Sequence, residues 1–264
     1  MYRCPLCQHA LALTDRQYQC VNRHSFDIAR EGYVNLLPVQ QKNSKDPGDN
    51  KEMMAARRAF LTAGWYAPLA KAVADWLSQL TPETLLDLGC GEGYYTATIK
   101  QSLPTSDLYG VDISKSAIKY AAKAHPSIRF SVASAYQLPF ADNSFDAIVR
   151  IYAPSKVQEL QRLIRSEGHL LTVTPGPEHL LEIKQAVYDM VRLHDDAISQ
   201  IDGFNHLQRK QLQFKLRFDS ADDVMALVQM VPLAWKFNAE QKQQYADSLP
   251  TISIDFLLDL YQRT

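Results

Sequence analysis

The sequence predicts an α/β protein in which a mostly parallel β-sheet, covered by helices on both faces, follows a small N-terminal metal-binding module. From Thr84 onward, short apolar strands alternate with helices, a pattern typical of parallel sheets. The first of these strands ends in a glycine-rich turn. Three of the four cysteines lie in the first twenty residues, which indicates a separate module there.

Length and composition limit the possible classes of protein. The chain has 264 residues, enough for one ordinary domain and a small appendage. Its 46% hydrophobic and 22% charged residues are typical of a globular protein with a substantial core. No apolar run reaches the roughly 18 residues of a membrane span, and the N-terminus lacks the apolar stretch of a secretory signal. We therefore expect a cytoplasmic protein.

Charge is distributed unevenly along the chain. The formal net charge is −1, but residues 1–60 contain nine Lys and Arg against six Asp and Glu. The N-terminal part is therefore positive and the remainder negative. This mild imbalance fits a phosphate-binding surface and an ordinary solvated surface about equally well.

A metal-ligand pattern opens the chain. Two residues separate Cys4 from Cys7, three separate Cys20 from His24, and twelve lie between the pairs. Zinc prefers a tetrahedral shell of thiolates and imidazole, and such short gaps let a tight turn aim two ligands at one ion. Three cysteines and one histidine leave no open position, so we predict one structural zinc ion per chain. A disulfide framework or free thiols explain this cluster less well, and His9 pairs with the cysteines less well than His24 does.

A linker and two helices are predicted between the module and the strand–helix alternation. Residues 40–49 are polar and contain Pro and Gly, as linkers do. One helix is expected from Asp49, which can cap it, towards Gly64, and another from Tyr66 to Leu80. The predicted organisation is a zinc-binding module at residues 1–37, a linker and connecting helix at 38–65, and a larger domain at 66–264.

The larger domain is predicted to contain seven strands in one mostly parallel sheet. The first five are expected at Thr84–Leu88, Leu108–Val111, Ile128–Val132, Ala147–Ile151 and Leu170–Thr174. Helices are expected between them at Tyr94–Ser102, Lys115–Ala124 and Lys156–Ile164. A long helix is expected after Glu178. The tail is then predicted to form a strand at Leu212–Phe218, a helix at Ala221–Met230 and a strand at Ile252–Leu257.

The turn after the first of these strands has the features of a ligand-binding site. Asp87 lies near the strand's end, and Gly89, Gly91 and Gly93 form a G-x-G-x-G turn that opens onto a helix. Glycines let a ligand approach the backbone closely, and the free amides of the helix favour an anionic group. The segment resembles the class I, Rossmann-like methyltransferases, in which this turn holds the amino-acid end of S-adenosylmethionine. The alternative is a nicotinamide-binding fold, but its fingerprint is G-x-G-x-x-G.

The next strand ends in an acid where such folds bind a ribose. Asp112 follows Tyr109-Gly110-Val111, and a carboxylate there can accept hydrogen bonds from both ribose hydroxyls. Taken alone, Asp112 is also a suitable cap for the helix from Lys115, but its place after the glycine turn favours cofactor contact. Ala133-Ser134 lies where these folds contact the adenine, which is a weaker match.

Several motifs together resemble one family. They are CPLC at residues 4–7, RHSFD at 23–27, EGYVNLLP at 31–38, DPGD at 46–49, DLGCGEGYY at 87–95, RIYAP at 150–154 and TPGP at 174–177. On these motifs the chain is similar to the RlmA family and looks closest to its Gram-negative type. The resemblance covers most of the chain and is densest from 1 to 180. Residues 166–169, SEGH, depart from the Pro-Gly-Gly turn that many relatives of the fold carry.

The RlmA family methylates N1 of a guanine in a hairpin of 23S ribosomal RNA, so the resemblance implies this activity with S-adenosylmethionine as methyl donor. It also implies a homodimer and cofactor contacts from Tyr66, Tyr95, Thr96 and His179. Tyr95 and Thr96 lie in the first turn of the glycine-loop helix, and His179 follows the last parallel strand. From the residues alone, Tyr66 fits a core aromatic better, and His179 fits a helix-start histidine without a ligand nearly as well.

The sequence signals for the acceptor pocket and for the RNA-binding surface are weaker than those for the zinc and cofactor sites. Arg150 and Tyr152 belong to the RIYAP motif, which stands where amino-methylating relatives carry Asn/Asp-Pro-Pro-Tyr, so they are acceptor-pocket candidates. Tyr152 can stack on the base or hydrogen-bond to it, although an ordinary buried tyrosine fits equally well. The sequence identifies no general base. The candidates for phosphate contacts are Arg30, Lys42, Lys45, Arg57 and Arg58.

Three functions compete at this point. An RNA guanine-N1 methyltransferase uses both the zinc pattern and the glycine turn, and it is the leading hypothesis. A small-molecule methyltransferase, such as one acting on a quinone precursor, explains the glycine turn but leaves the zinc module without a role. A non-catalytic RNA-binding protein with a dead cofactor pocket is the third, and it would fail to bind S-adenosylmethionine.

Overall fold

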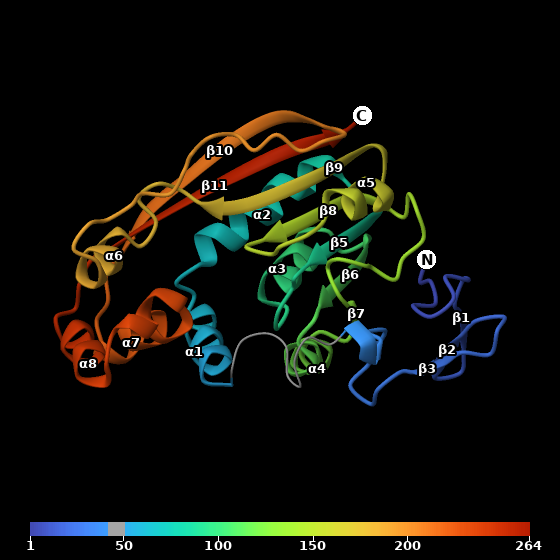
Figure 1. Cartoon of the computed structure of the whole chain (residues 1–264), viewed down its shortest axis with the longest axis horizontal. Helices are drawn as coiled ribbons and strands as arrows, with labels where there is room; N and C mark the ends of the chain where they lie inside the picture. The colour runs from blue at the N-terminus through green and yellow to red at the C-terminus, as the bar shows by residue number, and fades with distance from the viewer. Residues whose placement is uncertain (42–50) are drawn as a thin grey trace.

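One eight-stranded sheet runs through the molecule in the order β10-β11-β9-β8-β5-β6-β7-β4 (Figure 1). The structure is a computed structural model that describes residues 1–41 and 51–264. The strands are β4 (Val34–Asn35), β5 (Thr84–Leu88), β6 (Asp107–Asp112), β7 (Arg129–Val132), β8 (Phe145–Ile151), β9 (Ile164–Pro175), β10 (Phe204–Leu216) and β11 (Ile252–Arg263). From β4 to β9 every neighbouring pair is parallel, whereas β11 runs antiparallel to both β9 and β10.

The mostly parallel sheet confirms the predicted fold class. The seven predicted strands are β5 to β11, and the two-residue strand β4 adds an eighth at the edge by pairing with β7. The helices are α1 (Lys51–Thr62), α2 (Ala67–Leu80), α3 (Tyr94–Ser102), α4 (Lys115–Ala124), α5 (Val157–Leu163), α6 (Leu181–Val187), α7 (Ala221–Met230) and α8 (Ala239–Asp247), with 3-10 turns η1 (Val39–Gln41) and η2 (Pro232–Lys236).

Both faces of the sheet are buried, as expected for parallel strands between helices. Successive side chains of a strand point to opposite faces, so Leu85 of β5 packs into a core with α2, α4 and α7, whereas Leu86 and Leu88 pack into a second core with α5. Among the described residues, no helix is long and apolar enough to cross a membrane.

The long helix predicted after Glu178 is wrong. Helix α6 has only seven residues, and residues 188–203 form neither helix nor strand. Most of residues 191–200 are exposed, so this stretch has no buried apolar face to offset the cost of helix formation. Helix α8 was not predicted, although the capping box between Asn238 and Gln241 is a sequence signal for its start.

The N-terminal module is fixed to the larger sheet. Its own sheet consists of β1 (Ala12–Thr14), β2 (Gln17–Gln19) and β3 (Ser25–Asp27). The amide of Arg3 donates to the Pro139 carbonyl at 2.8 Å. The buried Tyr2 ring stacks on Phe140 and meets the edge of Tyr109 on β6. The module lies at one end of the molecule and α6–α8 at the other (Figure 1). The proposed domain boundaries stay a prediction.

Tyr2 provides a test of this attachment. Tyr2→Ala is expected to lower the free energy of unfolding by about 3–5 kcal/mol, because it leaves a cavity between the rings of Tyr109 and Phe140. Tyr2→Phe keeps the ring and is expected to cost less than about 1.5 kcal/mol. Urea denaturation of both variants measures the difference. Equal stability of the two variants would show that the ring does not anchor the module.

Candidate active site

Two tight turns bring the four predicted metal ligands together. The amide of Gln8 donates to the Cys4 carbonyl at 2.8 Å, and that of Arg23 donates to the Cys20 carbonyl at 2.9 Å. Gln8 and Arg23 both have positive φ, of 62° and 64°, so each turn folds back sharply. The ligand atoms of the four residues all lie within 4.8 Å of one another; the residues are Cys4, Cys7, Cys20 and His24.

The ligand geometry fits zinc. The Nδ1 atom of His24 lies 3.5 Å from the sulfurs of both Cys4 and Cys20, and the sulfurs of Cys7 and Cys20 are 3.6 Å apart. Tetrahedral zinc, with bonds of about 2.3 Å to sulfur and about 2.0–2.1 Å to nitrogen, places its ligand atoms roughly 3.6–3.8 Å apart. His9 lies outside the cluster, with Nδ1 3.1 Å from the Cys7 carbonyl. The module therefore holds a structural zinc ion, with Nδ1 of His24 as the histidine ligand.

The protein backbone prepares one thiolate for the metal. A hydrogen bond from the His9 amide lowers the pKa of Cys7 to about 5, so this thiol is ionised at neutral pH. Burial acts in the opposite direction on Cys4 and raises its pKa to about 11. Because zinc binds the thiolate form, a bound ion would displace the proton from Cys4.

The glycine turn has the shape that a closely bound ligand requires. Gly89, Gly91 and Gly93 all have positive φ, between 54° and 83°. A Cβ atom at Gly89 would lie 2.4 Å from the Cβ of Ala153, so only glycine fits there. A Cβ atom at Gly91 would meet none of the described residues within 4 Å, so they leave space open above the turn. Helix α3 begins directly after Gly93 and directs its first amides towards this space.

Asp87 is held in a buried position beside this turn. The Thr96 hydroxyl donates to its carboxylate at 2.6 Å, and Thr96 itself is fully buried. Burial raises the pKa of Asp87 to about 7. Asp87 is therefore poised between its two charge states near neutral pH, and Thr96 contributes to the site through Asp87.

The Asp112 carboxylate lies on the other side of the glycine turn and is held there by two backbone amides. Its Oδ2 atom accepts the amide of Gly91 at 3.0 Å and its Oδ1 atom accepts the amide of Ser114 at 2.8 Å. Ser114, not Asp112, caps α4 by accepting the amide of Ala117. These two hydrogen bonds orient the Asp112 carboxylate beside the glycine turn. The amide of Ala133, at the weaker adenine position, donates to the Asp112 carbonyl.

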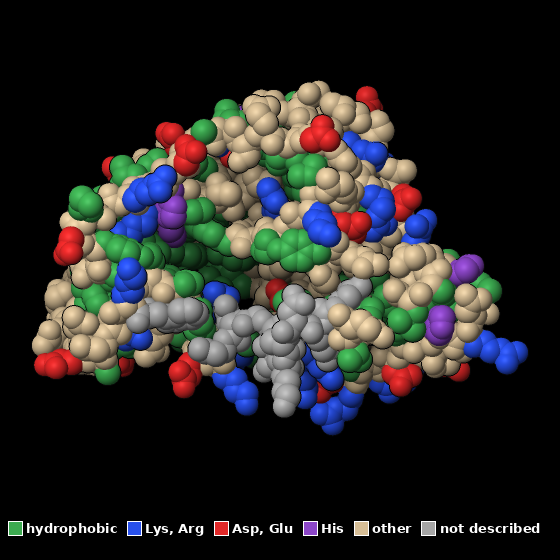
Figure 2. Space-filling view, in the orientation of Figure 1, with side chains coloured by type: hydrophobic (Ala, Val, Ile, Leu, Met, Phe, Trp, Pro, Cys, Tyr) green, Lys and Arg blue, Asp and Glu red, His purple; other side chains and the backbone are tan. Residues whose placement is uncertain are grey.

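Phe256 was not predicted as a site residue, but it lies against three residues that were. Phe256 of β11 lies 5.1 Å from Tyr66, 6.0 Å from Tyr152 and 4.8 Å from His179, measured between ring centroids. We call these four residues the aromatic cluster. Figure 2 shows one face of the molecule that is hollowed between α6–α8 and the main body, with hydrophobic side chains on the floor of the hollow. Tyr95 packs on Tyr94 with ring centroids 5.1 Å apart.

The predicted basic residues are placed differently from one another. Arg150 on β8 donates to the Ser155 hydroxyl at 2.8 Å, and burial lowers its pKa. Arg58 donates two hydrogen bonds to Glu92 and lies over the Tyr120 ring, so it braces α1 against the glycine turn. The side chain of Arg30 is 91% exposed. Arg57 lies on α1 and interacts electrostatically with Tyr95. Lys42 and Lys45 lie outside the described residues.

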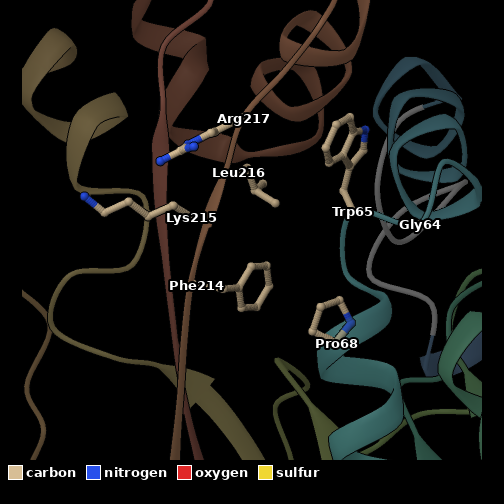
Figure 3. A pocket seen from close by; sticks show the side chains of 7 residues that line it. All are labelled: Gly64, Trp65, Pro68, Phe214, Lys215, Leu216 and Arg217. Atoms are coloured by element: carbon tan, nitrogen blue, oxygen red, sulfur yellow. The ribbon is translucent and has the colours of Figure 1, made fainter.

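A second cavity, of about 540 Å³, does not contain the predicted residues. It lies between the start of α2 and the end of β10 and is lined by Gly64, Trp65, Pro68, Phe214, Lys215, Leu216 and Arg217. Its apolar side chains face one another, whereas the two cations point to the opposite side of β10 (Figure 3). This groove is therefore apolar and separate from the glycine turn.

Comparison with known proteins agrees with both halves of this arrangement. Residues 2–45 match the family model described as "RlmA, N-terminal", and residues 85–172 match "Methyltransferase domain". The 23S rRNA (guanine(748)-N(1))-methyltransferase of Streptomyces fradiae is 32% identical over 96% of this chain and 94% of its own. YxjB of Bacillus subtilis, for which the same class of enzyme is proposed, is 30% identical over 98% of this chain and 97% of its own.

The chain belongs to the family of 23S rRNA (guanine-N1)-methyltransferases. Demethylmenaquinone methyltransferase of Thermotoga maritima, a small-molecule enzyme, is 30% identical over only 49% of this chain and 59% of its own. The similarity to this small-molecule enzyme therefore extends over about half of the chain. Membership also identifies S-adenosylmethionine as the methyl donor.

Loss of a zinc ligand tests the metal centre. Cys7→Ser is expected to abolish zinc binding and unfold the module, while affinity for S-adenosylmethionine stays within roughly twofold, because the two sites share no residue. Cys90→Ser changes the cysteine outside the cluster and is the matched control, expected to keep its zinc. Metal analysis of the purified proteins decides. Full zinc content in the Cys7 variant would show that the ligand set is wrong.

The pKa of Asp87 predicts a pH dependence. S-adenosylmethionine carries positive charge on its amino-acid end, so the ionised carboxylate should bind it more tightly than the protonated form. Ionisation increases as pH rises towards the pKa of about 7, and affinity is expected to rise roughly tenfold between pH 5.5 and 7. Asp87→Asn should bind more weakly and show no such rise. Calorimetry at each pH tests this, and the same slope in both proteins would contradict it.

Proposed function

We propose that this chain transfers the methyl group of S-adenosylmethionine to N1 of a guanine in a hairpin of 23S ribosomal RNA. The observation that carries the proposal is the combination, in one chain, of a zinc cluster and a glycine turn with full-length similarity to the Streptomyces fradiae enzyme. A small-molecule methyltransferase shares the turn alone.

The residues around the glycine turn fit the methyl donor. We propose that the open space above Gly91 takes its amino-acid end, beside Asp87, and that Asp112 accepts its ribose hydroxyls. Tyr66, Tyr95 and His179 stay proposed contacts. When bound, S-adenosylmethionine supplies a methyl group attached to a positively charged sulfur.

The chain's main contribution to the reaction is alignment of the acceptor. Guanine N1 carries a proton at neutral pH, and that proton must leave before or during transfer. With the donor bound, N1 would release its proton to solvent and take the methyl group with its electron pair, and S-adenosylhomocysteine would leave with the electrons of the former carbon–sulfur bond. Holding the two reacting atoms in line supplies much of the rate acceleration. Our proposed acceptor pocket lies at the end of β8, with Arg150 and Tyr152, beside the aromatic cluster.

RNA enters this pocket as an unpaired base, because specific recognition of RNA targets loops whose bases can be turned outward. The proposed phosphate contacts are Arg30, Lys42, Lys45, Arg57 and Arg58. We further propose that the enzyme works in the cytoplasm as a homodimer, on the basis of its family. The Gram-negative subtype stays a prediction.

A methylation assay with a matched inactive variant tests the function. With labelled S-adenosylmethionine, the protein is expected to label one guanine of 23S rRNA at N1, located by mass mapping. Gly89→Val places a branched side chain against Ala153 and should abolish labelling without removing the zinc. RNA affinity should fall steeply with added salt, since the contacts are to phosphates. Labelling of a quinone precursor in place of RNA would sink the proposal.

A further inference from the structure

A chain of hydrogen bonds with a defined direction links β11 to the proposed acceptor pocket. The amide of Asp255 donates to Nδ1 of His179, with 3.4 Å between the nitrogens. The Nε2 atom of His179 lies 3.4 Å from the Tyr152 hydroxyl. A backbone amide can only donate, so Nδ1 is the acceptor and the single proton of a neutral imidazole is on Nε2. His179 therefore donates to the oxygen of Tyr152.

His179 is held in this neutral form. It is buried, and burial, with smaller contributions from the neighbouring His194 and Lys184, lowers its pKa to about 3. Tyr152 in turn stays protonated, because burial raises the pKa of its hydroxyl above the ordinary value. At neutral pH, the direction of the chain is therefore fixed at both residues.

Tyr152 is placed where a base can reach it. It follows the last residue of β8 with a φ of 56°, unusual for a residue with a side chain, and its amide donates to Val173 of β9 at 3.2 Å. The ring rests against Phe256, yet 47% of the residue is exposed. Since its oxygen already accepts a hydrogen bond from His179, the hydroxyl proton of Tyr152 is available to a ligand.

We propose that Tyr152 recognises the acceptor base by donating its hydroxyl proton to O6 of guanine, and that His179 is the positioning residue that fixes this direction. The inference rests on the proposed function and deepens it by assigning base specificity to one atom. In guanine, the group next to N1 is the O6 acceptor, whereas adenine carries an amino group there. Two donors would then face each other, so adenine is rejected.

The same hydrogen bond assists the reaction. When guanine N1 loses its proton, part of the negative charge moves onto O6. A donor aimed at that atom stabilises the charged form more than the neutral one, so it contributes to the rate and not only to binding. Removal of one such donor typically lowers kcat by about 10²-fold or more in other enzymes. A donor to O6 should also lower the pKa of N1 in the complex.

The first experiment compares Tyr152→Phe with the wild-type protein on an RNA hairpin that carries either guanine or 6-thioguanine at the target position. The sulfur of 6-thioguanine is a weak acceptor. At saturating S-adenosylmethionine, Tyr152→Phe is expected to lower kcat at least about tenfold on guanine, but less than about threefold on 6-thioguanine. It should also shift the rise of kcat with pH upward by about one pH unit on guanine. Equal losses on both substrates, or an unshifted pH profile, overturn the inference.

The second experiment tests the direction of the chain. His179→Leu removes the donor to Tyr152, whereas His179→Gln keeps an N–H group near the Nε2 position. At saturating S-adenosylmethionine, so that a weakened donor contact of His179 does not affect kcat, we expect the leucine variant to lose as much kcat on guanine as Tyr152→Phe. The double variant should lose no more, and glutamine should recover part of the rate. Additive losses overturn the positioning role of His179.

The experiments distinguish failure of the proposed function from failure of the role assigned to Tyr152. Absence of guanine methylation by the wild-type protein defeats the proposed function itself. Normal wild-type activity together with an unaffected Tyr152→Phe variant defeats only the assignment of Tyr152.

Discussion

The pairing of β5 with β6 is the constraint on which the methyl-donor site depends. In this parallel register Leu88 lies beside Val111, so both strands end at the same level. The Val111 carbonyl then accepts the amides of Gly89 and Cys90, and the Asp112 carboxylate accepts that of Gly91. Each bond comes from the neighbouring strand. The glycine turn therefore has its shape before any ligand arrives, and the ligand need not order it.

The order of strands explains why distant motifs share one site. The chain builds β5, β6 and β7 towards one edge and then crosses to β8 and β9 on the other side of β5. Ligands of open α/β sheets bind at such a reversal, at the carboxyl ends of the strands. The proposed methyl-donor contacts come from the ends of β5 and β6, and the acceptor candidates come from β8 and the loop after β9. Antiparallel β11 completes the site, because the Asp255 carbonyl and carboxylate bind the amides of Gly176 and Glu178.

How much of the fold and of the site could be predicted from the sequence depended on how far apart the interacting residues lie along the chain. The four zinc ligands and the glycine turn are local patterns. The spacing of their residues in the sequence was enough to predict both. The partner of Asp87 was also near, since Thr96 is nine residues away. Phe256 and Asp255 could not be found, because they reach His179 across about 76 residues through a register that no local pattern encodes. The helix after Glu178 is shorter than predicted, because residues 191–200 are mostly exposed and bury no apolar face.

The position of the zinc module suggests how metal and methyl transfer are related. The module lies on the β7 edge of the sheet, attached by β4 and by Tyr2, whereas Tyr152 and His179 lie on the β9 and β11 side. Zinc therefore lies away from the proposed acceptor pocket, and we infer that it acts by stabilising the module. In the proposed complex, the module holds its surface at a fixed place relative to that pocket. A hairpin that contacts both would be held in one register, so that one guanine, and not its neighbour, reaches the donor of Tyr152.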